Sequence, residues 1–444
     1  MAFQEFGMDN HWLPFTPNRS FRKDPRVFVA AEGMHFTTHD GKQVIDGISS
    51  LWCVAAGHRR APINDAIKAQ LDTLDYATAF QASNDKAFRA AEMIAAMAPG
   101  DLNKVLFCNS GSEAADTAMK LALAYHRARG EGHRNVFIGR ERGYHGVGFG
   151  GMSVGGIPGN RKVFGSAFLP RVDHMRFIHD PVNHAYIHNQ EPVWAEDALA
   201  DLEQRILPLH DPSNVAAIMV EPVAGSAGWY LPPQGYLQKL RAICDKHGIL
   251  LIFDEVITGF GRLGTNFAAD YYGVVPDMLN FAKAVTNGVF PLGGVICRDK
   301  LYDAMMNTSA PEHAVEFFHG YTYSGHPVAC AAAIATLDLY KSENLFARAG
   351  EMGPVLGDAF HSTFTGLPNV IGIRSLGLAA AVELAPIAGL PGKRAYDIFI
   401  DCFHKGALVR PAGDVLVIAP PFIVEKSHID TLVNTLADAI KKNA

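Results

Sequence analysis

The chain has 444 residues, 48% of them apolar and 19% charged, which is the composition of a globular protein with a large core. Its net charge of −6 offers no basic surface for nucleic acid, and no apolar run reaches the roughly 18 residues of a membrane span. The first residues lack the basic and apolar blocks of a signal peptide, and six scattered cysteines without CxxC spacing suit reduced thiols, so we expect a cytoplasmic protein.

The two ends of the chain differ in pattern from its middle. Both ends mix helices with short strand pairs, at 35–46 and at 370–383. This pattern predicts a smaller α+β domain built from residues 1–60 and 330–444, around a large domain at 61–329.

The middle of the chain alternates strand-like runs with helical patterns. Gly248 is a typical helix stop, and the apolar run after it has no polar interruption, as in a parallel strand buried on both faces. Strand, helix and strand in this order predict a wound, mostly parallel α/β sheet. In chain order, the expected elements are a strand at 104–108, a helix at 112–129, a strand at 215–220, a helix at 233–246 and a strand at 249–253.

Two glycine-rich motifs and a histidine cluster do not fit the chemistry they suggest. Residues 146–151 match GxGxxG and residues 151–155 match GxSxG, but both motifs need a helix directly afterwards, and 156–160 has the composition of a loop. His184 and His188 are four residues apart without an intervening Glu, and nearby prolines indicate irregular backbone. We therefore expect no dinucleotide site, no serine nucleophile and no metal site here.

The stretch 109–115, NSGSEAA, lies between an expected strand and an expected helix. Gly111 lets the backbone approach a ligand closely, and Ser112 is placed to cap the helix. Free N–H groups and the helix dipole would then hold a phosphate. The same pattern also suits an ordinary helix cap with Glu in the first turn.

Two ionisable residues follow buried strands. Asp254 ends the strand at 249–253, where ligands gather in wound sheets, and it needs either a cation such as a protonated pyridine nitrogen or a structural ion pair with Arg262. Lys283 follows 29 residues later among small and apolar neighbours. Burial would depress its pKa and make it an imine-forming amine, unless its side chain reaches back to water.

Two further residues have both a ligand-binding and an ordinary reading. Tyr144, between glycines, could stack on a flat heterocycle or pack in the core. Arg410, in a turn beside an apolar strand, could clamp a carboxylate bidentately or form a surface ion pair. A phosphate cradle, a stacking tyrosine, a strand-end aspartate and an imine-forming lysine together supply what pyridoxal phosphate requires.

Over essentially its whole length, the chain resembles a class III (ω-type) aminotransferase of fold type I. The residues that carry the resemblance are FDEVITGFGR at 253–262, Ala282 and Lys283, and HGYTYSGHP at 319–327. The resemblance implies an α/β fold with a large wound, mostly parallel sheet domain and a small α+β domain. It also implies a homodimer or a dimer of dimers with shared active sites, a small-molecule amino donor and a keto-acid acceptor.

The resemblance further implies roles for single residues. Lys283 would hold pyridoxal 5'-phosphate as a covalent aldimine and move the proton between the substrate Cα and the cofactor, while Asp254 would keep the pyridine nitrogen protonated. Arg410 resembles a mobile arginine for the keto-acid carboxylate, with Glu221 as a candidate resting partner. The other implied roles are ring contacts by Tyr144 and Val256, phosphate binding by Gly111, Ser112 and the neighbouring subunit's copy of Thr322, and pocket walls from Phe15, Trp52, Phe80, Tyr144 and Ala224.

The segments WLPFT at 12–16 and SLWC at 50–53 resemble the ω-amino acid:pyruvate group. The expected reaction is therefore amino transfer from an ω-amino acid or primary amine, such as β-alanine, to pyruvate. The alternatives are the adenosylmethionine-8-amino-7-oxononanoate aminotransferase of biotin synthesis and a decarboxylase or aminomutase of the same fold. Ala55, Ala56 and Phe290 depart from the group's pattern, and we expect them to reshape the pocket.

Overall fold

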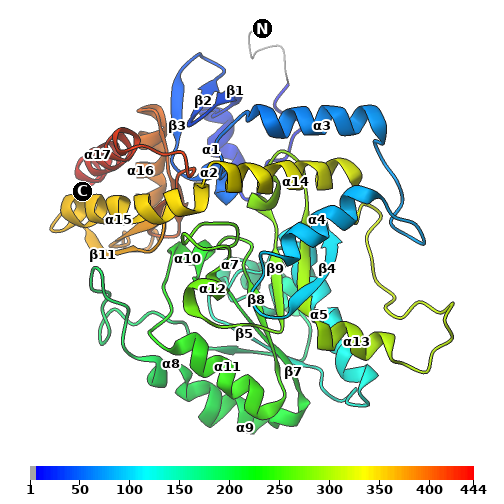
Figure 1. Ribbon diagram of the computed structural model, residues 1–444. Helices are drawn as coiled ribbons and strands as arrows, with labels where there is room; N and C mark the ends of the chain where they lie inside the picture. The colour runs from blue at the N-terminus through cyan, green and yellow to red at the C-terminus, as the bar shows by residue number, and fades with distance from the viewer. Residues whose placement is uncertain (1–6) are drawn as a thin grey trace.

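The computed structural model describes residues 7–444. Their centre is a seven-stranded sheet in the order β4-β10-β9-β8-β7-β5-β6 (Figure 1). Neighbouring strands from β6 to β9 are parallel, and β10 is antiparallel to both β4 and β9. The predicted wound, mostly parallel sheet is therefore confirmed. The strand bounds are Leu102–Cys108 (β4), Val136–Arg140 (β5), Val172–Met175 (β6), Val215–Val220 (β7), Leu250–Asp254 (β8), Met278–Phe281 (β9) and Gly293–Arg298 (β10).

Helices cover both faces of this sheet because its strands are apolar on both sides. One face packs against α5 and α13, and the other against α11 and α14. The helices of this region are α3 (Ala61–Thr73), α4 (Asp85–Ala95), α5 (Gly111–Ala128), α6 (Phe149–Val154), α7 (Pro158–Phe164), α8 (Ala195–Asp201), α9 (Leu207–His210), α10 (Gly225–Gly228), α11 (Tyr236–His247), α12 (Ala268–Tyr272), α13 (Asp299–Met306) and α14 (Pro327–Ser342), with shorter turns η2 (Gly165–Ala167), η3 (Leu202–Ile206), η4 (Pro212–Asn214) and η5 (Lys283–Thr286).

Two four-stranded sheets lie beside the large one. Their orders are β1-β2-β3-β13 and β11-β12-β15-β14, and β13 pairs in parallel with β3, so the two ends of the chain share one sheet (Figure 1). The strand bounds are Phe28–Glu32 (β1), His35–Thr38 (β2), Gln43–Asp46 (β3), Val370–Ser375 (β11), Ala380–Leu384 (β12), Ala407–Leu408 (β13), Arg410–Ala412 (β14) and Val415–Ile418 (β15). The helices here are α1 (Asn18–Lys23), α2 (Ser49–Trp52), α15 (Leu345–Phe364), α16 (Lys393–His404) and α17 (Lys426–Lys442).

Most expected elements form within a residue or two of their predicted bounds. The run at 215–220 is β7, and α11 ends at Gly248, whose φ of 66° suits glycine. The expected loop at 156–160 is wrong, because α7 begins at Pro158, a residue well suited to the first turn of a helix. No helix within residues 7–444 is long and apolar enough to cross a membrane.

The glycine-rich stretch before α7 is explained by close packing. A Cβ on Gly151 would collide with the backbone carbonyl of His145, and one on Gly148 would collide with the Asp116 side chain. Ser153, the supposed nucleophile, is buried in α6, where its hydroxyl donates to Phe149 O. The glycines therefore let α6 approach α5 and do not form a dinucleotide loop.

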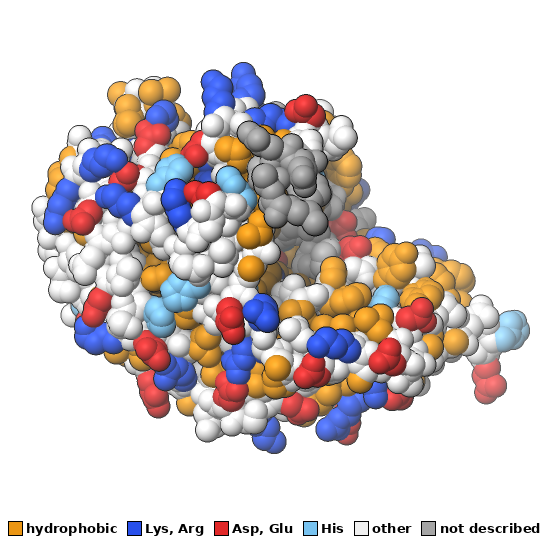
Figure 2. All heavy atoms as spheres, turned by 90° about the horizontal axis from the view of Figure 1, so that it is seen from above, with side chains coloured by type: hydrophobic (Ala, Val, Ile, Leu, Met, Phe, Trp, Pro, Cys, Tyr) orange, Lys and Arg blue, Asp and Glu red, His pale blue; other side chains and the backbone are white. Residues whose placement is uncertain are grey.

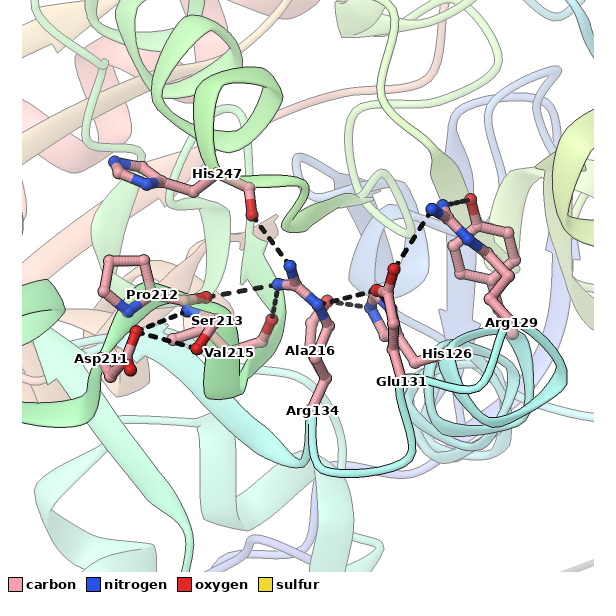
Figure 3. A network of polar contacts seen from close by, with 11 residues as sticks. His126, Arg129, Glu131, Arg134, Asp211, Pro212, Ser213, Val215, Ala216 and His247 are labelled. Atoms are coloured by element: carbon pink, nitrogen blue, oxygen red, sulfur yellow. Dashed lines mark hydrogen bonds and ion pairs between the residues drawn. The ribbon is translucent and has the colours of Figure 1, made fainter.

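Arg134 ties together the amino-terminal ends of neighbouring strands, far along the sheet from the strand ends that carry Asp254. Its guanidinium donates to the carbonyls of Pro212, Val215 and His247 and to the Glu131 carboxylate (Figure 3). Only 12% of the side chain is exposed. One cation thus satisfies three carbonyls from two separate segments, at 212–215 and at 247.

Replacing Arg134 by Ala is expected to lower the free energy of unfolding by about 2–3 kcal/mol, because several carbonyls lose a charged donor together. Thermal unfolding by calorimetry measures this as a lower transition temperature. Arg129→Ala is the matched control, since Arg129 belongs to the same network but is half exposed and bonds Tyr125 and Glu131. Equal transition temperatures for the two variants would contradict the assignment.

Candidate active site

A cavity of about 290 Å³ lies outside the carboxyl ends of the central strands, where ligands bind in wound α/β sheets. It gathers residues from the end of β8, the turn after β9, the start of α5 and the loop before α6. The sequence-predicted residues on its walls are Gly111, Ser112, Tyr144, Glu221, Asp254, Val256 and Lys283.

Lys283 begins the turn η5 directly after β9, and its side chain lies on the cavity wall. Its φ of 51° is in the left-handed region, which is strained for any residue except glycine. Burial lowers the pKa of Lys283, while the nearby Cys53 thiol and the Asp254 carboxylate act in the opposite direction. The structure thus places a partly desolvated amine next to a carboxylate.

Asp254 and Glu255 are neighbours in sequence but serve different sites, because successive strand residues point to opposite faces. Asp254 points into the cavity, where its carboxylate pairs with His145 Nδ1 at 2.7 Å and accepts from Val256 N at 3.2 Å. Glu255 accepts from the N–H groups of Ala268 and Ala269 at the start of α12. Burial raises the pKa of Glu255 to about 7.

The alternative ion pair between Asp254 and Arg262 does not form. The Arg262 guanidinium instead donates to Ser49 Oγ and to the carbonyls of Leu378 and Pro420. Burial lowers the pKa of Arg262 to about 9. The Asp254 carboxylate is therefore left facing the cavity with a histidine as its side-chain partner.

The start of α5 forms a cradle, although not with the predicted cap. Ser110 is the N-cap, since its side chain accepts from Glu113 N, whereas Ser112 Oγ accepts from Val147 N. A Cβ on Gly111 would lie 2.9 Å from the Val256 methyl groups, so only glycine fits there. The first backbone N–H groups of α5 have no acceptor within the helix, and the residues that carry them, Gly111 and Ser112, line the cavity. Helix N-termini of this kind bind anions.

The residues around the cavity match the chemical groups of pyridoxal phosphate. The N-terminus of an 18-residue helix suits the phosphate, and the cavity holds an aromatic side chain, Tyr144, and an apolar one, Val256, for the two faces of a flat ring. The Asp254 carboxylate suits a protonated ring nitrogen, and Lys283 supplies an amine for the carbonyl carbon.

Four of the five predicted pocket-wall residues, all except Tyr144, lie outside the cavity of the single chain. Phe15 and Phe80 are exposed by 77% and 55%, and Trp52 is buried in a stack against Trp229 with ring centroids 5.1 Å apart. Ala224 is buried and bridged to the backbone of Tyr230.

Two predicted ligand contacts also lie apart from the cavity walls. Thr322 is exposed, and its carbonyl accepts from Tyr76 Oη. Arg410 is half-buried on β14, and burial lowers its pKa while the nearby Tyr144 and Glu221 act against that shift. Glu221 itself accepts from the N–H groups of Tyr144 and Gly225.

The structure also adds residues that we did not predict. His145 is buried against Asp254, and Cys53 and Ser226 line the cavity. The sequence offered one signal for His145, which directly follows Tyr144 in the motif GYHG. Phe290 lines the cavity as expected, whereas Ala55 and Ala56 are fully buried and are not among the residues that line it.

The segment 49–52 before Cys53 is a left-handed turn. The φ values of Ser49, Ser50, Leu51 and Trp52 are 48°, 47°, 64° and 72°. L-residues in this region cost about 1–2 kcal/mol each. The buried Asp46 carboxylate stabilises the turn by accepting from the N–H groups of Ile48 and Ser50 and from Ser50 Oγ, and Arg262 holds Ser49 from the other side.

Leu51→Gly is expected to be more stable than Leu51→Ala by about 1 kcal/mol, because glycine adopts the left-handed region without strain. An ordinary right-handed helix gives the opposite order. Both variants lose the same side chain beyond Cβ, so contacts of the Leu51 side chain cancel in the comparison. Calorimetric transition temperatures decide the order, and a more stable alanine variant would contradict the left-handed turn.

The geometry defines an enzyme site in which a buried amine, a carboxylate and an anion-binding helix surround one cavity. The chain belongs to the class-III aminotransferases, whose family model matches residues 18–440. It is 51% identical to an omega-aminotransferase of Caulobacter vibrioides, covering 97% of this chain and 96% of the relative. It is 48% identical to a beta-alanine--pyruvate aminotransferase of Pseudomonas aeruginosa, covering 98% and 96%.

A solved structure supports the same assignment of the fold. An amine transaminase from an uncultivated Pseudomonas species, in its PLP-bound internal aldimine form, superposes with a TM-score of 0.90 at 33% identity, covering 99% of this chain and all of the other. The α/β fold expected from the resemblance, that of the pyridoxal-phosphate-dependent transaminases, is thereby confirmed.

Proposed function

We propose that this protein is a pyridoxal-phosphate-dependent aminotransferase that moves an amino group from an ω-amino acid or primary amine, such as β-alanine, to pyruvate. The observation that carries the proposal is the cavity in which Lys283, Asp254 and the start of α5 meet. Relatives named as a beta-alanine--pyruvate aminotransferase, at 48% identity, and an omega-amino acid--pyruvate aminotransferase, at 46% identity, support this donor class and acceptor.

Each side chain near the cofactor has a separate role in the proposed reaction. When bound, pyridoxal phosphate supplies the carbonyl that accepts the amino group and a ring that withdraws electrons from the substrate Cα. Lys283 Nζ takes the proton from the substrate Cα, for which its lowered pKa suits it. The Asp254 carboxylate holds a proton on the ring nitrogen, and His145 orients that carboxylate through its Nδ1.

The other predicted contacts complete the site. Gly111 and Ser112 bind the phosphate, and Tyr144 and Val256 cover the two faces of the ring. Arg410 binds the keto-acid carboxylate by moving toward the cavity from its place on β14.

The active unit is a homodimer, by itself or paired into a dimer of dimers. Large apolar side chains that are each more than half exposed lie in segments before α1, around α4 and before α14, namely Phe15, Phe80, Phe88, Phe318 and Tyr323. Apolar side chains gather on the face seen from above, beside a hollow (Figure 2). Such patches typically mark interfaces. A second copy would bring Thr322, Phe15 and Phe80 to its neighbour's cavity, and fully active monomers in sedimentation would contradict this.

The domain division follows the two chain ends. Residues 1–60, of which 1–6 lie outside the described residues, and 330–444 belong to the small domain and residues 61–329 to the large one, which places Lys283 and Asp254 in the large domain and Arg410 in the small domain. Helix α14 crosses the boundary at 330 and packs against α3, α4 and η5 of the large domain. The shared sheet of β3 and β13 supports this division.

The protein acts in the cytoplasm.

Product analysis with matched donors tests the proposed reaction. Incubation with β-alanine and pyruvate should yield alanine at the rate at which the donor is consumed. Amino transfer only from adenosylmethionine would instead support the biotin-pathway alternative, and release of carbon dioxide, or turnover without a keto acid, would support a decarboxylase or an aminomutase.

A further inference from the structure

Asn280, in the central strand β9, is fully buried, and within residues 7–444 neither its Oδ1 nor its Nδ2 has a hydrogen-bond partner. A buried amide without partners is costly, and native proteins hold few of them. An apolar residue of similar shape would fit this strand better. An asparagine at this position is therefore explained either by a hydrogen-bond partner that a ligand or a water molecule supplies, or by a functional role.

The neighbour of Asn280 across the sheet is Asp254. The two residues are paired in the parallel register of β8 and β9, so their side chains project from the same face about 4.8 Å apart. The alternation of the strands agrees, since Ile252 and Met278 both pack in the cluster beneath α5, whereas Phe253 and Leu279 pack in the cluster on the other face.

The Asp254 carboxylate has capacity for another donor. It bonds His145 Nδ1 and Val256 N, whereas an ionised carboxylate offers about four lone-pair sites. His145 Nε2, on the far side of the same ring, is also buried and has no partner within the described residues. Unpaired polar atoms thus flank Asp254, as they do where a buried water bridges a network.

We propose that Asn280 is a positioning residue for Asp254, donating its Nδ2–H to the carboxylate in the cofactor-loaded enzyme, directly or through one buried water. The inference rests on the proposed function, because it is the ring nitrogen of the cofactor that needs a fixed, ionised carboxylate. Asn280 itself touches neither cofactor nor substrate. A purely structural role is the alternative, and the two roles predict opposite effects on the protein without cofactor.

Asn280→Leu separates these roles, because it keeps the approximate shape and removes both polar atoms. The cofactor-free variant should unfold at the same temperature as the parent or higher, since a buried unpaired amide is lost. Its dissociation constant for pyridoxal phosphate, measured by fluorescence quenching, should rise roughly 10- to 100-fold, because a hydrogen bond to a charged group is missing. The pH dependence of the bound cofactor's absorbance should shift as well.

Two further variants control the experiment. Thr336→Val removes another buried unpaired oxygen, on α14 and outside the cavity wall, and should leave cofactor affinity unchanged. Asn280→Ser restores a donor and should recover part of the affinity. Asn280→Leu with parental affinity and pH profile, or with a destabilised cofactor-free protein, would overturn the proposal. A parent protein that binds no pyridoxal phosphate would instead refute the proposed function.

Discussion

Lys283→Ala should abolish multiple turnover, with a fall in rate of at least about 10⁴-fold. The variant loses both the amine that engages the cofactor carbonyl and the base that moves the proton at the substrate Cα, and each role contributes orders of magnitude. No other lysine lines the cavity wall within residues 7–444. Steady-state formation of alanine from pyruvate measures the loss.

A small primary amine added to Lys283→Ala should restore part of the rate, because it can enter the space left by the side chain. Lys120→Ala is the matched control, since Lys120 is exposed on α5 and should leave the rate unchanged. Normal cycling by Lys283→Ala would contradict the role of this residue. Equal losses in both lysine variants would point to a general effect of charge.

Asp254→Asn should lower the rate by about 10²–10³-fold, the usual cost of removing a preorganised charge from an active site. The amide fits the same space and can still bond His145, but it no longer favours a protonated ring nitrogen. The loss should appear in kcat, together with a weaker affinity for pyridoxal phosphate. Cofactor titration and initial rates measure the two effects separately.

Glu255→Gln is the matched control for Asp254→Asn. Both carboxylates are buried and adjacent in sequence, but Glu255 bonds the start of α12 and is absent from the cavity wall. Burial raises the pKa of Glu255 to about 7, so the uncharged glutamine resembles a form that is already populated at neutral pH. Glu255→Gln should change the free energy of unfolding and leave kcat unchanged. A similar loss of kcat in both variants would contradict the separate roles.

Three strands of the central sheet, β4, β7 and β8, were predictable because their apolar runs are bounded by turn residues and polar ends. The run at 215–220 has no polar residue and forms β7 at the predicted bounds. Asp254 could be placed at a strand end for the same reason. The antiparallel position of β10 between β4 and β9 depends instead on pairing between distant segments, which local patterns do not encode.

The details of the site depended on contacts that the sequence does not display. By residue type, Ser110 and Ser112 are equally good helix caps. Ser110 is the N-cap in the structure, because the Ser112 hydroxyl instead accepts from Val147 N. The left-handed turn at 49–52 contains no glycine, and tertiary bonds from Asp46 and Arg262 hold it. The predicted roles of Thr322 and the exposed phenylalanines stay predictions, because they need a second copy of the chain.

The visible spectrum of the purified protein during the two half-reactions tests the central claim most directly. The protein should bind pyridoxal phosphate and turn yellow, lose that colour on addition of β-alanine, and regain it when pyruvate follows. Lys283→Ala should show no such cycle, which ties the colour change to this residue. A protein that stays colourless after incubation with pyridoxal phosphate, or a yellow one that no amine bleaches, would contradict the account.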